Sequence, residues 1–216
     1  MGNDGRYSYE FLQSGNDAAF EGFYAIYIEA IPESERKSRQ QLAALVVRPD
    51  YRLLLLKRGA EVLGFTLAFI AADAGLWLLE YMAMARAQRS QGLGGALFHH
   101  ACEDVETHYG PLVGLLEVDS VNEASADLAT RQRRQAFYRR QGCRRLEGLS
   151  YILPLDGPPP PQMELMLYST APLDWVSRGQ LQQWLMVLYT RVYDCPADDP
   201  RIAAMLRSLT DPVKLK

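Results

Sequence analysis

The sequence has few cysteines and no excess of positive charge. Its three cysteines, Cys102, Cys143 and Cys195, are widely spaced and form no CxxC pair, which argues against a disulfide framework and a zinc site and fits a reducing compartment. The 23 basic and 26 acidic residues give a net charge of −3. We therefore expect no nucleic-acid partner, because the chain as a whole does not attract a polyanion.

Long apolar runs are also missing. The longest tract, 62–79, is divided by Asp73-Ala74-Gly75 into two strand-sized halves, which is typical of a hairpin and not of a membrane span. The first residues, MGNDGRYSYE, lack the basic flank and apolar region of a secretory signal. His99 and His100 are adjacent and lack the spacing of a metal pair. We expect a cytoplasmic protein with no membrane partner and no metal.

What the sequence does contain is the composition of a globular protein, with 48% hydrophobic and 23% charged residues. Hydrophobic spacing and Gly or Pro punctuation predict alternating helices and strands. The predicted strands cover 51–57, 62–71, 76–84, 112–119, 144–154 and 163–169. The predicted helices cover 16–30, 33–46, a segment from Leu93 to the break at Gly110, and 124–141 closed by Gly142, with further helices near 181–189 and 202–209.

A glycine-rich stretch stands between a predicted strand and a predicted helix. Gly92, Gly94 and Gly95 fall within four residues; without Cβ atoms they let a ligand approach the backbone N–H groups of a helix N-terminus, where the helix dipole favours anions. A phosphate is the expected ligand, and a plain tight turn is the alternative. Neither a Walker A motif nor a GxGxxG motif is present.

Two motifs resemble the GNAT superfamily of acyl-CoA-dependent N-acetyltransferases. The first is Arg89-Ser90-Gln91-Gly92-Leu93-Gly94, after a strand that ends Tyr81-Met82-Ala83-Met84, and the second, Ala136-Phe137-Tyr138-Arg139-Arg140-Gln141-Gly142-Cys143, is similar to the family's FYxxxGF block. The resemblance implies a mixed, mostly antiparallel α/β sheet with helices on both faces. It covers about 7–169, so we predict a GNAT domain over 1–169 and a helical C-terminal extension over 170–216.

The resemblance also implies acetyl-CoA as co-substrate. Its pyrophosphate would bind the backbone N–H groups of the loop, and its pantetheine arm would pair with the backbone of Met82 and Met84, where two central strands separate. The N–H of Met84 would stabilise the oxyanion. The implied cofactor-binding residues are Met82, Met84, Arg89, Ser90, Gln91, Gly92, Leu93, Gly94 and Gly95.

Tyr138 matches the family tyrosine that donates a proton to the departing CoA thiolate. A phenol with a pKa near 10 can protonate a thiolate only when strongly coupled to it, or can hold it by a hydrogen bond. The alternative is a tyrosine that packs in the core beside Phe137. In many members an asparagine precedes this tyrosine by about seven residues, but Asn122 lies too far upstream, so that role is not transferred.

The attacking amine must lose a proton, so a carboxylate acting directly or through water is required. Glu80 lies in an otherwise apolar strand on the same side as Met82 and Met84 by period-two alternation, and burial there would raise its pKa. Glu117 lies in the neighbouring predicted strand. Both remain candidates for the base, and for each the alternative is a charge that faces water.

These observations predict transfer of an acetyl group from acetyl-CoA to a primary amine by direct attack in a ternary complex. The acceptor, a small molecule or a peptide, is not specified by the sequence, and a homodimer is left open. The alternative function is a non-catalytic acyl-CoA-binding or regulatory module on the same fold, which would bind phosphate in the same way.

Overall fold

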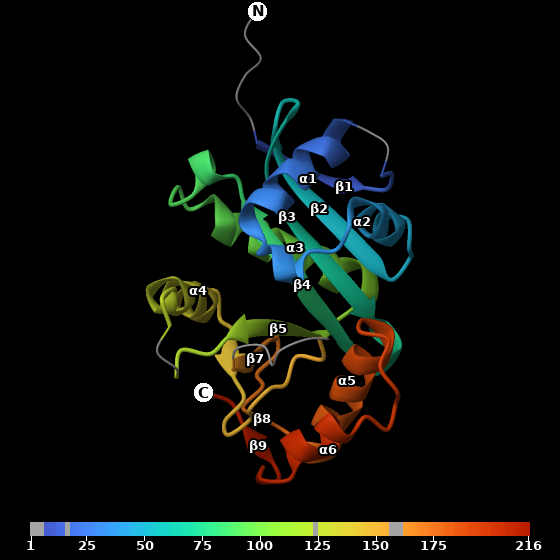
Figure 1. Ribbon diagram of the computed structural model, residues 1–216, viewed down its shortest axis with the longest axis vertical. Helices are drawn as coiled ribbons and strands as arrows, with labels where there is room; N and C mark the ends of the chain where they lie inside the picture. Colours follow the sequence, from blue (N-terminus) through green and yellow to red (C-terminus); the bar gives the residue numbers. More distant parts are fainter. Residues whose placement is uncertain (1–6, 16–17, 123–124, 156–161) are drawn as a thin grey trace, which may run out of the picture. The chain divides into compact units, whose positions relative to one another are not determined.

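The computed structural model describes residues 7–15, 18–122, 125–155 and 162–216, and Figure 1 shows its elements. The described strands are β1 (Tyr7–Leu12), β2 (Tyr51–Arg58), β3 (Glu61–Ala71), β4 (Leu76–Met84), β5 (Val113–Asp119), β6 (Arg144–Arg145), β7 (Met163–Tyr168), β8 (Trp175–Val176) and β9 (Val213–Lys214). The described α-helices are α1 (Ala18–Ala30), α2 (Arg39–Val46), α3 (Leu93–Tyr109), α4 (Leu128–Arg140), α5 (Arg178–Arg191) and α6 (Pro200–Leu206). None of these helices has the length and apolar character needed to cross a membrane.

The chain divides into two compact units. Unit 1 comprises residues 1–70 and 79–108, and unit 2 comprises residues 71–78 and 109–216. The main sheet has the strand order β1-β2-β3-β4-β5-β7-β6, and β4 belongs to both units. Because β4 and β5 are parallel and the pairs β1–β2, β2–β3, β5–β7 and β6–β7 are antiparallel, the predicted mixed, mostly antiparallel sheet is confirmed.

The sheet of unit 1 is covered by helices on both faces. Phe23 of α1 packs edge-on against Phe65 of β3, with ring centroids 4.7 Å apart. On the other face, Leu97 and Ala101 of α3 pack with Leu54 of β2 in one buried cluster. In Figure 1, α1 and α2 lie in front of the strands and α3 lies behind them.

A register shift between Leu56 and Lys57 allows neighbouring residues of β3 to face the same side. Leu56 pairs with Gly64 and Lys57 pairs with Val62, so Leu63 has no Cα partner on β2. Such a bulge interrupts the alternation of side chains along a strand.

The predicted helix over 33–46 is wrong in its first part. Only a 3-10 turn, Glu33–Glu35, precedes α2. Helix α2 begins after Ser38, whose side chain accepts from the backbone N–H of Gln41 while the Gln41 side chain accepts from the backbone N–H of Ser38. This capping box fixes the start of the helix.

In unit 2, β5 pairs with β4 over only three residue pairs, Leu76–Leu78 with Val113–Leu115. The other edge of β5 pairs with β7 along all of Gly114–Asp119. The predicted strand over 144–154 is correct only at its start, since β6 has two residues and Gly148 takes a left-handed φ of 78° that breaks an extended run.

The residues beyond 169 are part of unit 2. Trp184 of α5 donates its indole N–H to the carbonyl of Ala74 at 3.3 Å, and Arg191 forms an ion pair with Asp73 at 2.6 Å. The predicted helices of this region are confirmed, and β8 and β9 add a two-stranded sheet. The division into a domain over 1–169 and an extension over 170–216 stays a prediction. The predicted helix starts at residues 16 and 124 lie outside the described residues.

Candidate active site

The glycine-rich loop presents backbone N–H groups that have no protein partner. Within the described residues, the amides of Ser90–Gly94 donate no hydrogen bond to another protein group, whereas Gly95 donates to the carbonyl of Gly92 at 3.2 Å. The first turn of α3 carries no acidic side chain. The start of α3 therefore has the donors and the dipole orientation that bind an anion.

The shape of this loop depends on left-handed backbone conformations. Ser90 has a φ of 65° and Gly92 a φ of 80°. A Cβ placed on Gly92 would meet no atom within 4 Å, so there is open space next to the loop. The loop is held by Arg89, whose Nε donates to the carbonyl of Met84 at 3.1 Å, and by Gln91, whose side chain donates to the carbonyl of Ala87 at 3.0 Å.

Met82 and Met84 are half-buried on β4, against the cluster that includes Leu97 of α3. The backbone N–H of Ala85 donates to the carbonyl of Leu63 at 2.8 Å. Along an antiparallel strand, successive residues direct their backbone N–H and carbonyl groups alternately toward and away from the neighbouring strand. Because Ala85 bonds to β3, the N–H and carbonyl of Met84 point away from β3. This direction is compatible with the predicted pairing of Met84 with an extended ligand.

Glu80 is a buried carboxylate in unit 1. Its side chain is 5% exposed and its Oε1 forms an ion pair with Lys37 Nζ at 2.8 Å. Within the described residues its other oxygen, Oε2, is buried without a hydrogen-bond partner. Burial, followed by the charge of Glu80, raises the pKa values of Tyr51 and Tyr81. Glu80 is thus a charged group among phenols that stay protonated, with one oxygen open to a further donor.

The predicted orientation of Glu80 is wrong. Glu80 lies near Tyr51, which is on the α1 and α2 face because the next residue, Arg52, points to the other face and pairs with Asp104 of α3 at 2.5 Å. Met82 and Met84 instead pack on the α3 side. Tyr81 also contacts the α1 face, where its ring meets that of Tyr27, so strict alternation is not kept at Glu80 and Tyr81.

Glu117 is held in unit 2 by two phenols. The hydroxyl of Tyr151 donates to its Oε1 and the hydroxyl of Tyr193 donates to its Oε2. Burial and then the charge of Glu117 raise the pKa of Tyr151 well above its ordinary value. Both oxygens of Glu117 therefore already accept hydrogen bonds, in contrast to those of Glu80.

Tyr138 lies on α4 in unit 2, three residues before the C-cap at Gln141. The helix ends in a Schellman motif, in which Cys143 N–H donates to the carbonyl of Tyr138 at 3.0 Å and Gly142 has a φ of 92°. The ring is half-buried and contacts Phe137 edge-on at 5.1 Å. Burial raises the pKa of Tyr138 to about 12, with Arg134 opposing and Cys143 adding to the shift, so the phenol is protonated at neutral pH.

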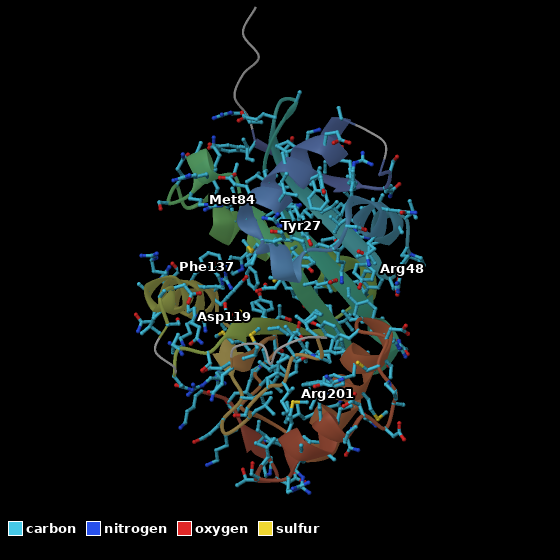
Figure 2. All side chains as sticks on the ribbon, in the orientation of Figure 1. Tyr27, Arg48, Met84, Asp119, Phe137 and Arg201 are labelled. Atoms are coloured by element: carbon cyan, nitrogen blue, oxygen red, sulfur yellow. The ribbon has the colours of Figure 1, made fainter. Side chains whose placement is uncertain are left out.

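Two arginines of α4 form ion pairs with nearby aspartates. Arg134 pairs with Asp119 at 2.7 Å and Arg131 pairs with Asp127 at 2.9 Å. Figure 2 labels Asp119 on β5 and Phe137 on α4. Among the described residues, no group of three or more His, Cys, Asp or Glu side chains could hold a metal ion.

The structure places Glu80, Met82, Met84 and the loop Arg89–Gly95 in unit 1, where Arg89 bonds to Met84, and it places Glu117 and Tyr138 in unit 2. Sequence reasoning missed the partners of both carboxylates, Lys37 for Glu80 and the two tyrosines for Glu117. No local sequence pattern identifies these partners, because they are distant in the chain: Tyr193 is 76 positions from Glu117.

The family assignment follows from a comparison of the sequence with known families. The family described as "Acetyltransferase (GNAT) family" matches residues 17–143, which is more than half of the chain. The chain belongs to the GNAT acetyltransferase family. None of the curated proteins matches its sequence.

Solved structures of GNAT proteins have the same fold. A putative GNAT-family acetyltransferase from Bacteroides thetaiotaomicron is 19% identical with a TM-score of 0.70, covering 88% of this chain and 99% of its own. The ribosomal-protein-S18-alanine N-acetyltransferase from Escherichia coli is 18% identical with a TM-score of 0.55, covering 78% and 96%. NAA60 from Arabidopsis thaliana, solved in complex with acetyl-CoA, is 14% identical with a TM-score of 0.58, covering 76% and 99%.

Proposed function

We propose that this GNAT protein transfers the acetyl group of acetyl-CoA to a primary amine by direct attack in a ternary complex. The observation that carries the proposal is the run of amides at the start of α3, Ser90–Gly94, which donate to no other group in the part of the chain that the structure describes. These donors and the open space at Gly92 fit the pyrophosphate of a nucleotide-linked thioester. Acetyl-CoA, when bound, supplies the activated acetyl group.

Glu80 is the group that we propose to take the proton from the amine. Between the two candidate carboxylates, only Glu80 has a buried oxygen without a hydrogen-bond partner among the described residues. That oxygen can accept a proton directly or through one water. Glu117 already accepts from two phenols, and we assign it a structural role.

Tyr138 is proposed to hold the departing thiolate. With a pKa of about 12, its phenol is a weaker acid than a thiol whose pKa is about 8.5, so complete proton transfer to the sulfur is unfavourable. A hydrogen bond from the phenol stabilises the thiolate without that transfer, and solvent supplies the proton. The backbone N–H of Met84 is proposed to donate to the thioester oxygen as negative charge develops there.

The acceptor is proposed to be a small-molecule or peptide amine. The Escherichia coli relative is named for an alanine of a ribosomal protein, which makes a protein N-terminus one acceptor to test. The cytoplasmic location and the homodimer stay predictions.

The first test is thermal unfolding of the protein with acetyl-CoA, NAD or ATP. A ligand at about 100 times its dissociation constant adds roughly 2.7 kcal/mol and raises the midpoint by several degrees. We expect this shift with acetyl-CoA alone. A larger shift with another nucleotide would contradict the assignment of the loop.

The second test separates the enzyme from a non-catalytic acyl-CoA-binding module. We expect Tyr138→Phe to lower kcat about a hundredfold, measured as release of free thiol, while the acetyl-CoA-induced thermal shift is retained. Tyr7→Phe is the matched control, since Tyr7 is 44% exposed and should leave kcat unchanged. A wild-type protein that binds acetyl-CoA but acetylates no amine would be a binding module.

A further inference from the structure

The chain contains four lysines, Lys37, Lys57, Lys214 and Lys216. Two of them form ion pairs with glutamates of unit 1: Lys37 with Glu80 at 2.8 Å and Lys57 with Glu10 at 2.7 Å. The ammonium group of Lys37 is therefore paired with Glu80, the carboxylate that we propose as the base. The Lys57 pair has a similar length but joins β2 to Glu10 of β1 and does not involve that carboxylate.

The backbone around Lys37 is fixed and holds the side chain in this place. The backbone N–H of Lys37 donates to the hydroxyl of Tyr27 at 2.7 Å, and Tyr81 donates to the carbonyl of Glu35 at 3.0 Å. Tyr27, labelled in Figure 2, is completely buried in unit 1. Ser38 then starts α2, so Lys37 is anchored on both sides.

The same contacts do not bury the amine completely. The side chain of Lys37 is 24% exposed, whereas that of Glu80 is 5% exposed. Glu80 also keeps its second oxygen free of hydrogen bonds among the described residues. The pair is thus an amine and a proton acceptor in ion-pair contact, and its carboxylate lies on the strand that continues to Met82 and Met84.

We propose that Lys37 is an acetyl acceptor of the protein's own active site. This inference rests on the proposed function, because it uses the same thioester and the same base. Glu80 takes a proton from the Lys37 ammonium, and the neutral Nζ attacks the thioester carbonyl carbon. The N–C bond forms as the C–S bond breaks, the nitrogen releases its second proton to solvent, and the thiolate takes a proton from solvent, giving Nε-acetyl-Lys37, free CoA and a protonated Glu80.

Acetylation of Lys37 would change the site in a defined way. An acetylated lysine has no charge, so the ion pair with Glu80 is lost and Oε1 becomes open along with Oε2. The modification would therefore remove the internal amine from the base and leave the carboxylate accessible to an external amine.

The experiment maps acetyl groups on the purified full chain, before and after incubation with isotopically labelled acetyl-CoA and no acceptor. Cleavage after Glu35 and Glu61 places Lys37 and Lys57 in one peptide, and fragment masses assign the label to either lysine. We expect Lys37 to be labelled about a hundredfold faster than Lys57. The rate per chain should not change on dilution of the protein, because the acceptor is internal.

Two variants test the chemistry. Lys37→Arg keeps the charge and should remove the label, and Glu80→Gln keeps the shape and should slow labelling about a hundredfold. Equal labelling of Lys37 and Lys57, unaffected by Glu80→Gln, would mean uncatalysed acetylation and would overturn the proposal. A rate per chain that falls on dilution would also overturn it.

Failure of this inference is distinguishable from failure of the proposed function. If acetyl-CoA raises the unfolding midpoint and the protein acetylates added amines but Lys37 stays unlabelled, only the inference is wrong. If acetyl-CoA causes no shift and neither added amines nor Lys37 are acetylated, both are wrong.

Discussion

Gly64 shows how one residue controls the end of the strand that carries Met84. A Cβ at position 64 would lie 2.4 Å from Met84 Sδ and 2.9 Å from the carbonyl oxygen of Ala83. The sulfur is at the flexible end of a side chain, but the carbonyl belongs to β4 itself. A side chain at this position would therefore displace the backbone that we propose to contact the thioester.

We predict that Gly64→Ala lowers the free energy of unfolding by about 1–3 kcal/mol and weakens acetyl-CoA binding. Urea denaturation measures the first effect, and the acetyl-CoA-induced thermal shift measures the second. Gly179→Ala is the control, because a Cβ there meets nothing within 4 Å. Unchanged stability and binding in Gly64→Ala would show that β4 tolerates the added methyl group.

At the scale of elements, the segment that follows α5 holds β5 through Glu117. Tyr193 comes two residues after the end of α5 and donates to Glu117 in the middle of β5. Helix α5 is also attached to the turn before β4, through Arg191 and Asp73. The C-terminal segment thus stabilises the strands of unit 2.

We predict that Tyr193→Phe lowers the free energy of unfolding by about 1–3 kcal/mol, because a carboxylate oxygen loses its donor. The kcat of acetyl transfer and its pH profile should stay unchanged, since Glu117 is assigned no proton transfer. Urea denaturation and initial rates measure the two effects. A shifted pH profile would instead identify Glu117 as the base.

At the scale of the whole molecule, tyrosine ionisation should control stability at alkaline pH. Seven of the twelve tyrosines have raised pKa values, with burial as the largest cause: Tyr9, Tyr27, Tyr51, Tyr81, Tyr138, Tyr151 and Tyr189. In the unfolded chain these phenols ionise near pH 10. The folded state keeps these phenols neutral to higher pH. Their contribution to the free energy of unfolding is therefore complete below pH 10 and is lost as the pH rises above it.

We predict that the free energy of unfolding falls steeply above about pH 10, by up to ~1.4 kcal/mol per pH unit for each such tyrosine. Tyrosinate absorbance followed against pH should rise in step with loss of circular dichroism. In urea the same absorbance should titrate near pH 10. Titration of all twelve tyrosines near pH 10 in a folded protein would contradict this prediction.

The sequence was sufficient to predict features that depend on local patterns. Gly142 was predicted as the end of a helix, and the structure confirms a Schellman motif there. The family and the mixed sheet were also predicted correctly. By contrast, the side on which Glu80 lies was predicted incorrectly, because alternation fails at Glu80 and Tyr81. Lys37 and Tyr193 were missed because their contacts join distant segments whose meeting depends on tertiary packing.

The division of the chain into units has a consequence for its synthesis. Unit 1 is complete once residue 108 has been made, but unit 2 takes residues 71–78 from within that first half and needs the chain to its last element. Ribosomes add roughly 5–20 residues per second, so the strand segment Leu76–Leu78 waits on the order of 10 s for β5 and the elements after it. During that interval of translation, this apolar segment has no β5 to pair with.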